Sequence, residues 1–270
     1  VDAELIRSHD GIGQLAHDEF GGLHPAIDDD GAHRIPPRTR MLAWPLDGGP
    51  RVSEVPREID VATIGEDVRL FEAIRTTRAI RRLRPDPVPP ALIRKVCEAG
   101  TFAPSGGNRQ PWSFIAVTDA ARRAFVAERY QRAFASYIAP ALEAAKDPSF
   151  SDATRRNIRA ALHLAEHMHE VPVHLFVAGF QRRSGPQPQA LFPAVQNILL
   201  ACRAVGLGAS LTTVHRAFGA EIDAHLGLPE DRPSCALIPI GWPIGRYGRP
   251  PRNPVDACLF WERFEASRDV

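Results

Sequence analysis

Residues 68–119 decide the fold, and they read VRLFEAIRTTRAIRRLRPDPVPPALIRKVCEAGTFAPSGGNRQPWSFIAVTD. Apolar residues recur at close to helical spacing over Glu66–Thr77, and a proline-rich break then starts a second helix that should end near Ala103. Trp112–Thr118 has the composition of a strand, and Asp119 can cap the N-terminus of a long helix behind it. The stretch therefore predicts helices and a strand, with a tight polar loop between the second helix and the strand.

Helix and strand patterns continue through the rest of the chain, without a regular succession of parallel βαβ units. The expected helices cover Asp152–His169, Phe192–Val205, Gly219–Leu226 and a helix-like segment over Asn253–Phe264, and the expected strands cover Val173–Gly179, Ala209–Thr213 and Cys235–Gly241. Gly206 should end the helix that precedes it. A helix-rich mixture of this kind indicates an α+β sandwich.

The first part of the chain differs from the rest. Gly-Gly and Pro-Pro pairs interrupt it so often that long helices or strands are not expected, although short apolar stretches such as Met41–Trp44 could dock on a neighbour. We therefore expect an irregular extension over residues 1–67 that wraps over the core or over a partner subunit, followed by one domain over residues 68–270.

Composition limits the classes of partner. The formal net charge is +1, which gives no bulk electrostatic reason to expect nucleic acid or a membrane surface as a partner. No apolar run approaches the roughly 20 residues that span a bilayer, and the first residues lack the pattern of a signal peptide. The four cysteines form no CxxC pair. We interpret them as small core residues of a protein in the reducing cytoplasm.

Two polar features lie one helix apart. The arginines between Arg75 and Arg84 form a cluster that favours an anion, and Pro104–Trp112 is a loop whose glycines let backbone N–H groups approach a ligand closely. Together they indicate a phosphate-bearing organic cofactor. Each feature alone has a plainer explanation, because the arginines also suit a solvated helix end and the loop also suits a tight helix-to-strand connection.

Histidines offer weaker candidates. His163 and His167 share a helix face, but no third ligand stands at suitable spacing, so we predict no metal site. His215 follows the expected strand at Ala209–Thr213 closely. It either lines a substrate cavity or simply begins a helix.

Three blocks of sequence, in this order and spacing, are typical of one family. The first is the arginine segment running into Arg84–Pro89, and the second is Ala103–Trp112. The third comprises Gln196–Thr213, Leu226–Pro229 and Ala236–Gly245. On these blocks the chain resembles the FMN-dependent nitroreductase family over about residues 68–264.

The resemblance implies a nitroreductase-like α/β sandwich with a central, mostly antiparallel sheet flanked by helices, in an intertwined homodimer with FMN at the subunit interface. It also implies a set of cofactor-binding residues. These are Thr77, Arg78, Ala79, Arg81, Pro104, Ser105, Gly106, Gly107, Asn108, Gln110, Leu211, Thr212, Thr213, Arg249 and Arg252. Where the family usually has Arg-Arg-Ser-x-Arg, this chain has Thr77 through Arg81, so the first arginine and the serine are missing and another arginine should meet the phosphate.

Roles follow from the same resemblance. Arg81 should lie near N1 and O2 of the flavin, the backbone of Leu211–Thr213 near N5, and Arg252 near the phosphate. The implied activity passes hydride from NADH or NADPH through flavin N5 to a nitroaromatic, quinone or similar planar acceptor by a ping-pong mechanism, with no protein side chain as catalyst.

Two alternatives remain open. One is a specialised flavoprotein of the same fold, with a dedicated substrate, dehalogenation, flavin fragmentation or FMN holding. The other is a non-enzymatic anion-binding protein.

Overall fold

The computed structural model describes residues 59–264 apart from 180, 183–184 and 187. The first 58 residues of the predicted extension, Met41–Trp44 among them, lie outside this part of the chain. Residues 59–67 form a turn that contacts the rest of the molecule: the ammonium group of Lys95 donates to the carbonyl oxygens of Val61 and Ala62 at 3.1 and 3.0 Å. The Lys95 ammonium also pairs with Glu66 at 2.7 Å.

A five-stranded antiparallel sheet forms the centre of the described fold. Its strands are β1 (Leu83–Arg84), β2 (Trp112–Val117), β3 (Val173–Gly179), β6 (Gly208–Ala209) and β7 (Ser234–Pro243). The order is β1-β7-β3-β2, and β6 pairs with β7. A second small sheet pairs β4 (Gln181–Arg182) with β5 (Gly185–Pro186). The central strands β3 and β7 are buried along their whole length because helices cover both faces of the sheet.

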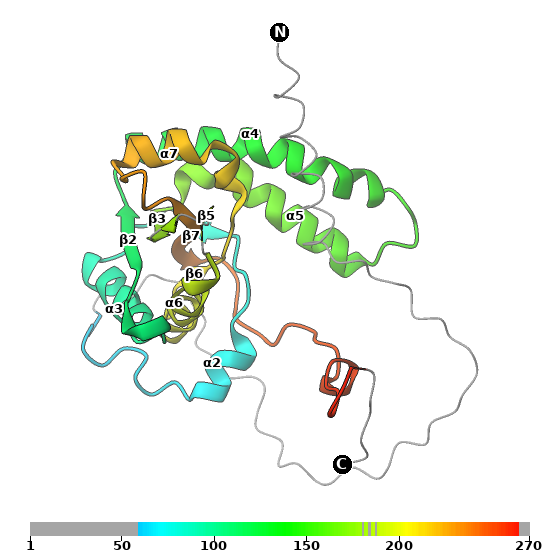
Figure 1. The fold of residues 1–270 in the computed structure, drawn as a ribbon. Helices are drawn as coiled ribbons and strands as arrows, with labels where there is room; N and C mark the ends of the chain where they lie inside the picture. Colours follow the sequence, from blue (N-terminus) through cyan, green and yellow to red (C-terminus); the bar gives the residue numbers. More distant parts are fainter. Residues whose placement is uncertain (1–58, 180, 183–184, 187, 265–270) are drawn as a thin grey trace.

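The helices divide between those two faces (Figure 1). They are α2 (Leu70–Thr76), α3 (Pro90–Thr101), α4 (Ala120–Ala144), α5 (Asp152–Glu166), α6 (Phe192–Ala204) and α7 (Gly219–Leu226). One core cluster joins α3 and α6 to alternate residues of β3, such as Leu175 and Val177. The other joins α4, α5 and α7 to residues of the opposite face, such as Phe176 and Leu237. The predicted α+β architecture is confirmed.

Local signals placed several boundaries correctly. The carboxylate of Asp119 accepts from the N–H of Arg122 at 2.9 Å, which is the predicted cap of α4. Gly206 follows α6 with φ +81°, and the next N–H, of Leu207, reaches back to the carbonyl of Cys202 at 2.8 Å. A left-handed residue suits glycine, so this stop signal was readable in the sequence.

Other predictions are wrong. The first helix begins at Leu70 rather than Glu66, since a turn occupies the preceding residues. The strand expected over Ala209–Thr213 is reduced to β6 and an isolated bridge between Thr212 and Leu237. Asn253–Phe264 is not a helix and holds only a short 3-10 turn at Val255–Ala257. A helix needs an apolar face buried against a neighbour, and this segment packs against no core.

The cysteines need one correction. Cys202 and Cys235 are buried and Cys97 packs against the core, but Cys258 is exposed because it lies in the segment that packs against no core. The prediction that all four are core residues is therefore wrong for Cys258. Within the described residues no helix combines the length and the apolar character needed to cross a membrane.

Candidate functional site

The arginine segment lies directly beside the chain that leads into Leu211–Thr213. The N–H of Ile80 donates to the carbonyl of Ala209 at 2.9 Å. Gly208 permits this close approach, since a Cβ there would stand 2.6 Å from the side chain of Leu83 and 2.8 Å from that of Ile80. The structure therefore brings two of the predicted groups, Thr77–Arg81 and Leu211–Thr213, to one place.

Arg81 is the partly buried cation of this place, whereas Arg78 and Ala79 are exposed. Burial lowers the pKa of Arg81, the nearby Tyr130 and Tyr137 raise it, and the charge of Arg78 lowers it. A guanidinium that is partly desolvated beside a second one is stabilised by an anion. This electrostatic setting suits the phosphate-bearing cofactor that the arginine cluster predicts.

Thr77 stands where the resemblance implies an arginine, and its hydroxyl is already engaged. Its side chain donates to the carbonyl of Ala73 at 2.6 Å, and its N–H donates to the same oxygen at 2.9 Å. Both donors therefore close the last turn of α2. Charge-assisted hydrogen bonds to an anion must therefore come from arginines of the segment, such as Arg78 and Arg81.

The turn at Leu211–Thr213 is held through its middle residue. Thr212 exchanges both of its main-chain hydrogen bonds with Leu237 of β7, each at 2.9 Å. Its hydroxyl accepts from the N–H of Val214 at 3.3 Å and lies 3.1 Å from the hydroxyl of Tyr130. The N–H of Thr212 is therefore not free for a ligand. Leu211, which is 40% exposed, and the half-buried Thr213 flank it.

The loop after α3 contains unusual backbone. Gly107, Asn108 and Gln110 have φ values of 61°, 51° and 47°, all in the left-handed region. Ser105 holds the loop together, since its carbonyl accepts from the N–H of Asn108 at 2.9 Å and its hydroxyl accepts from the N–H of Gln110 at 3.0 Å. Non-glycine residues in this region carry strain, and such strain concentrates at functional sites.

The loop and the arginine segment lie at opposite edges of the sheet within one copy of the chain. The loop, Pro104–Gln110, runs into β2 at one edge, and the arginine segment runs into β1 at the other. Three strand spacings separate these edges, which is about 14 Å. They also differ in level, because β2 starts opposite Gly179 whereas β1 pairs with the far end of β7 at Pro243. The side chains of one copy do not bring the two groups together.

The last two predicted residues lie in the C-terminal arm, defined here as residues 249–264. Arg249 and Arg252 are exposed, and the guanidinium of Arg252 donates to the carbonyl of Pro251 at 2.9 Å. The arm stands away from the sheet and helices (Figure 1). It leaves the body after Tyr247, whose hydroxyl donates to the carbonyl of Leu207 and whose ring lies 4.5 Å from the guanidinium of Arg203.

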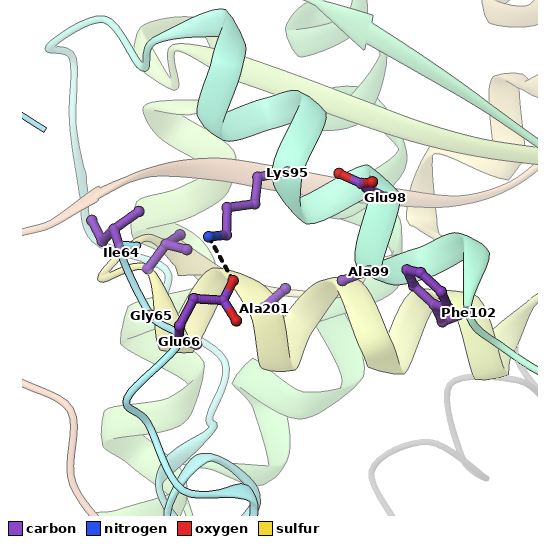
Figure 2. A pocket seen from close by; sticks show the side chains of 10 residues that line it. Ile64, Gly65, Glu66, Lys95, Glu98, Ala99, Phe102 and Ala201 are labelled. Carbon is purple, nitrogen blue, oxygen red and sulfur yellow. Dashed lines mark ion pairs between the residues drawn. The ribbon is translucent and has the colours of Figure 1, made fainter. Parts of the chain in front are cut away.

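A shallow hollow of about 290 Å³ opens elsewhere, between α3, α6 and the turn before α2 (Figure 2). Its wall is mostly apolar, with Ala99, Phe102 and Ala201, and the Lys95–Glu66 ion pair lies at its side. None of the predicted cofactor-binding residues lines it. It is therefore separate from the polar surface around Arg81.

Sequence reasoning missed the part played by two residues. Tyr130 lies in the long helix predicted after Asp119, and no local pattern predicts its hydrogen bond to Thr212. His215 lies in the 3-10 turn Val214–Phe218 and is completely buried, so it does not line a cavity. Its Nε2 lies 3.2 Å from the hydroxyl of Ser234, which donates to Asp223 at 2.5 Å.

Residues 74–242 match the sequence profile described as the nitroreductase family, which is more than half of the chain. The chain belongs to the nitroreductase family. An NADH dehydrogenase of Thermus thermophilus is 30% identical over 204 residues, covering 68% of this chain and 91% of that protein. The 5,6-dimethylbenzimidazole synthase of Rhodospirillum rubrum is 29% identical over 177 residues, covering 62% of this chain and 78% of that protein.

Solved structures agree with the family fold. Oxidized iodotyrosine deiodinase bound to FMN and 3-iodo-L-tyrosine superposes with a TM-score of 0.59 at 21% identity, over 73% of this chain and 100% of that chain. At this identity the likeness shows the fold alone. Relatives within the family carry different names and activities, and membership therefore does not define one reaction. It shows that the chain is a nitroreductase-family flavoprotein of oxidoreductase type.

Proposed function

We propose that the chain is an FMN-dependent oxidoreductase that moves electrons from NADH or NADPH to a nitroaromatic, a quinone or a similar planar acceptor in alternating steps. The observation that carries the proposal is the partly desolvated Arg81 beside the turn at Leu211–Thr213. A bound FMN supplies the two-electron chemistry, while the protein contributes orientation and electrostatics.

The residues fit an anionic flavin in three ways. Arg78 and Arg81 offer fixed positive charge to the phosphate or to the electron-rich pyrimidine edge. The backbone N–H groups of Leu211 and Thr213, on either side of Thr212, are candidates to donate hydrogen bonds to the edge of the flavin ring. The strained loop at Gly107–Gln110 offers the side-chain amides of Asn108 and Gln110 as donors, since the N–H groups of both residues are already bonded to Ser105.

The separation of loop and arginine segment supports a site shared by two copies. The loop of one copy would complete the site begun by the arginine segment of its partner, and the arm would bring Arg249 and Arg252 across. Exposed apolar side chains support such an interface. They are Leu70, Phe71 and Ile74 of α2, Phe102, and Val255, Leu259, Phe260 and Phe264 of the arm. The division into an extension (1–67) and a domain (68–270) stays a prediction.

An absorbance spectrum of the purified protein, followed by addition of NADH or NADPH, tests the proposal. We expect a flavin spectrum that bleaches within minutes and recovers when a nitroaromatic or a quinone is added. A flavin that no nicotinamide reduces would instead favour a specialised flavoprotein, for which the relatives named dimethylbenzimidazole synthase and iodotyrosine deiodinase are precedents. A colourless protein that takes up no FMN would favour the anion-binding alternative.

A further inference from the structure

The main chain of Thr212 has no donor left for a ligand to recruit. Its main chain is paired with Leu237 in both directions, and its hydroxyl contacts Val214 N–H and the hydroxyl of Tyr130. Its function in the turn is therefore to hold the chain. The amides that the turn can present to a ligand belong to its neighbours, Leu211 and Thr213, both of which keep exposed surface.

Tyr130 reaches this turn from α4. Its side chain is 2% exposed, and its ring stacks on Phe134 with centroids 5.8 Å apart. A buried hydroxyl requires a hydrogen-bond partner, and Thr212 provides it at 3.1 Å across 82 positions of sequence. The bond is thus a tertiary link between the long helix and the turn, set in a core that leaves the phenol little freedom.

The same phenol lies close to Arg81. Burial raises the pKa of Tyr130, while the hydrogen bond to Thr212 and the charge of Arg81 oppose that rise. On the other side, the Ile80–Ala209 backbone bond ties the residue before Arg81 to the chain before the turn. Tyr130 is therefore bonded to the turn at Thr212 and lies close to Arg81 of the arginine segment.

Resting on the proposed function, we infer that Tyr130 is a positioning residue of the flavin site. Its hydroxyl fixes Thr212, and this sets the amides of Leu211 and Thr213 and keeps them in register with Arg81. Without the hydroxyl the turn keeps its pairing to β7 but loses its side-chain anchor, so the amides that meet the flavin ring would be less well placed.

Tyr130→Phe tests the inference, because it keeps the ring and removes only the hydroxyl. We expect FMN to bind about three- to tenfold more weakly, the value of one hydrogen bond of this kind. We also expect a shift in the midpoint potential of the bound flavin. Thr212→Val, a second variant at a half-exposed position, should give the same losses, and the double variant should lose no more than either single variant.

Ile138→Val is the matched control, since it weakens the packing of the same helix without touching a polar group. Its unfolding temperature should fall as in Tyr130→Phe, with FMN affinity and potential unchanged. The inference is overturned if Tyr130→Phe behaves like this control, or if the two single variants are additive. An FMN titration of the wild type tests the proposed function separately. A wild type that binds no flavin would contradict both the proposed function and the positioning role of Tyr130.

Discussion

Arg81 combines partial burial with a neighbouring like charge, and this combination distinguishes it from the other arginines of the segment. Burial alone already disfavours its charged form, and the charge of Arg78 adds to that cost. A bound anion would relieve both costs. Surface arginines gain much less, because water already solvates their charge.

Arg81→Ala should therefore weaken FMN binding by about 1.5–3 kcal/mol, the range for a charge-assisted hydrogen bond. Arg81→Lys should recover part of the loss, because it keeps the charge but not the planar fork. Fluorescence titration of FMN measures both variants. Arg94→Ala, at an exposed position of α3, is the control and should bind FMN like the wild type. Equal affinity for wild type and Arg81→Ala would refute the role.

Two buried histidines make stability depend on pH. Burial lowers the pKa of His174 to about 4 and that of His215 to about 3, and Nδ1 of each lacks a hydrogen-bond partner. The Nε2 atoms face Met168 O and the Ser234 hydroxyl, so the neutral tautomers protonated at Nε2 fit. Between these values and the ordinary pKa of about 6.5, the unfolded chain binds more protons than the folded one.

The free energy of unfolding should consequently be highest above about pH 6.5 and fall as the pH drops toward 4. Each histidine should contribute a loss of about 2 kcal/mol between pH 7 and pH 5. Urea unfolding at the two pH values measures this loss. His215→Gln, which does not titrate, should show about half of the wild-type loss. A wild type equally stable at both values would contradict the account.

Residues that end helices could be predicted from the sequence, whereas residues with buried long-range hydrogen bonds could not. Asp119 and Gly206 were predicted because a helix end is determined within a few neighbours. The partners of Tyr130 and His215 lie 82 and 19 positions away, and only the fold brings them together. Residues defined by such long-range contacts could not be assigned from local patterns.

At the scale of elements, the loop after α3 combines a strained backbone with residues that the resemblance assigns to the cofactor. Its glycines were visible in the sequence, but the left-handed backbone of Asn108 and Gln110 was not, since neither residue usually requires it. The C-terminal arm shows the converse. Asn253 and Pro254 form a good local start for a helix, yet no core lies beneath the segment, and the expected helix does not form.

Gln110→Gly separates stability from binding in the loop. Glycine accepts the φ of 47° without strain, so the free energy of unfolding should stay equal or rise by up to about 1 kcal/mol. FMN affinity should fall about three- to tenfold if the amide side chain contacts the cofactor. Gly107→Ala is the opposite control, since it adds strain at φ 61° where a Cβ meets nothing closer than 3.9 Å. A less stable Gln110→Gly variant with unchanged affinity would contradict this view of the loop.

At the scale of the whole molecule, the architecture follows from patterns that many residues share. The buried strands and the helices on both faces were predicted because apolar periodicity is repeated along each element. The loop and the arginine segment lie about 14 Å apart at opposite edges of the sheet in one copy, and no local pattern predicts that separation. The exposed apolar residues of α2 and of the arm support a second copy as the missing half of the site.

The central claim is that one flavin is held by the arginine segment of one copy and the loop of its partner. Mixed dimers of Arg81→Ala and Asn108→Ala chains, carrying different tags and purified through both, test it most directly. Each variant alone should retain little FMN, whereas the mixed dimer has one site with both residues intact. We predict half of the wild-type flavin content at wild-type affinity. A mixed dimer that binds FMN no better than its parents would contradict the shared site.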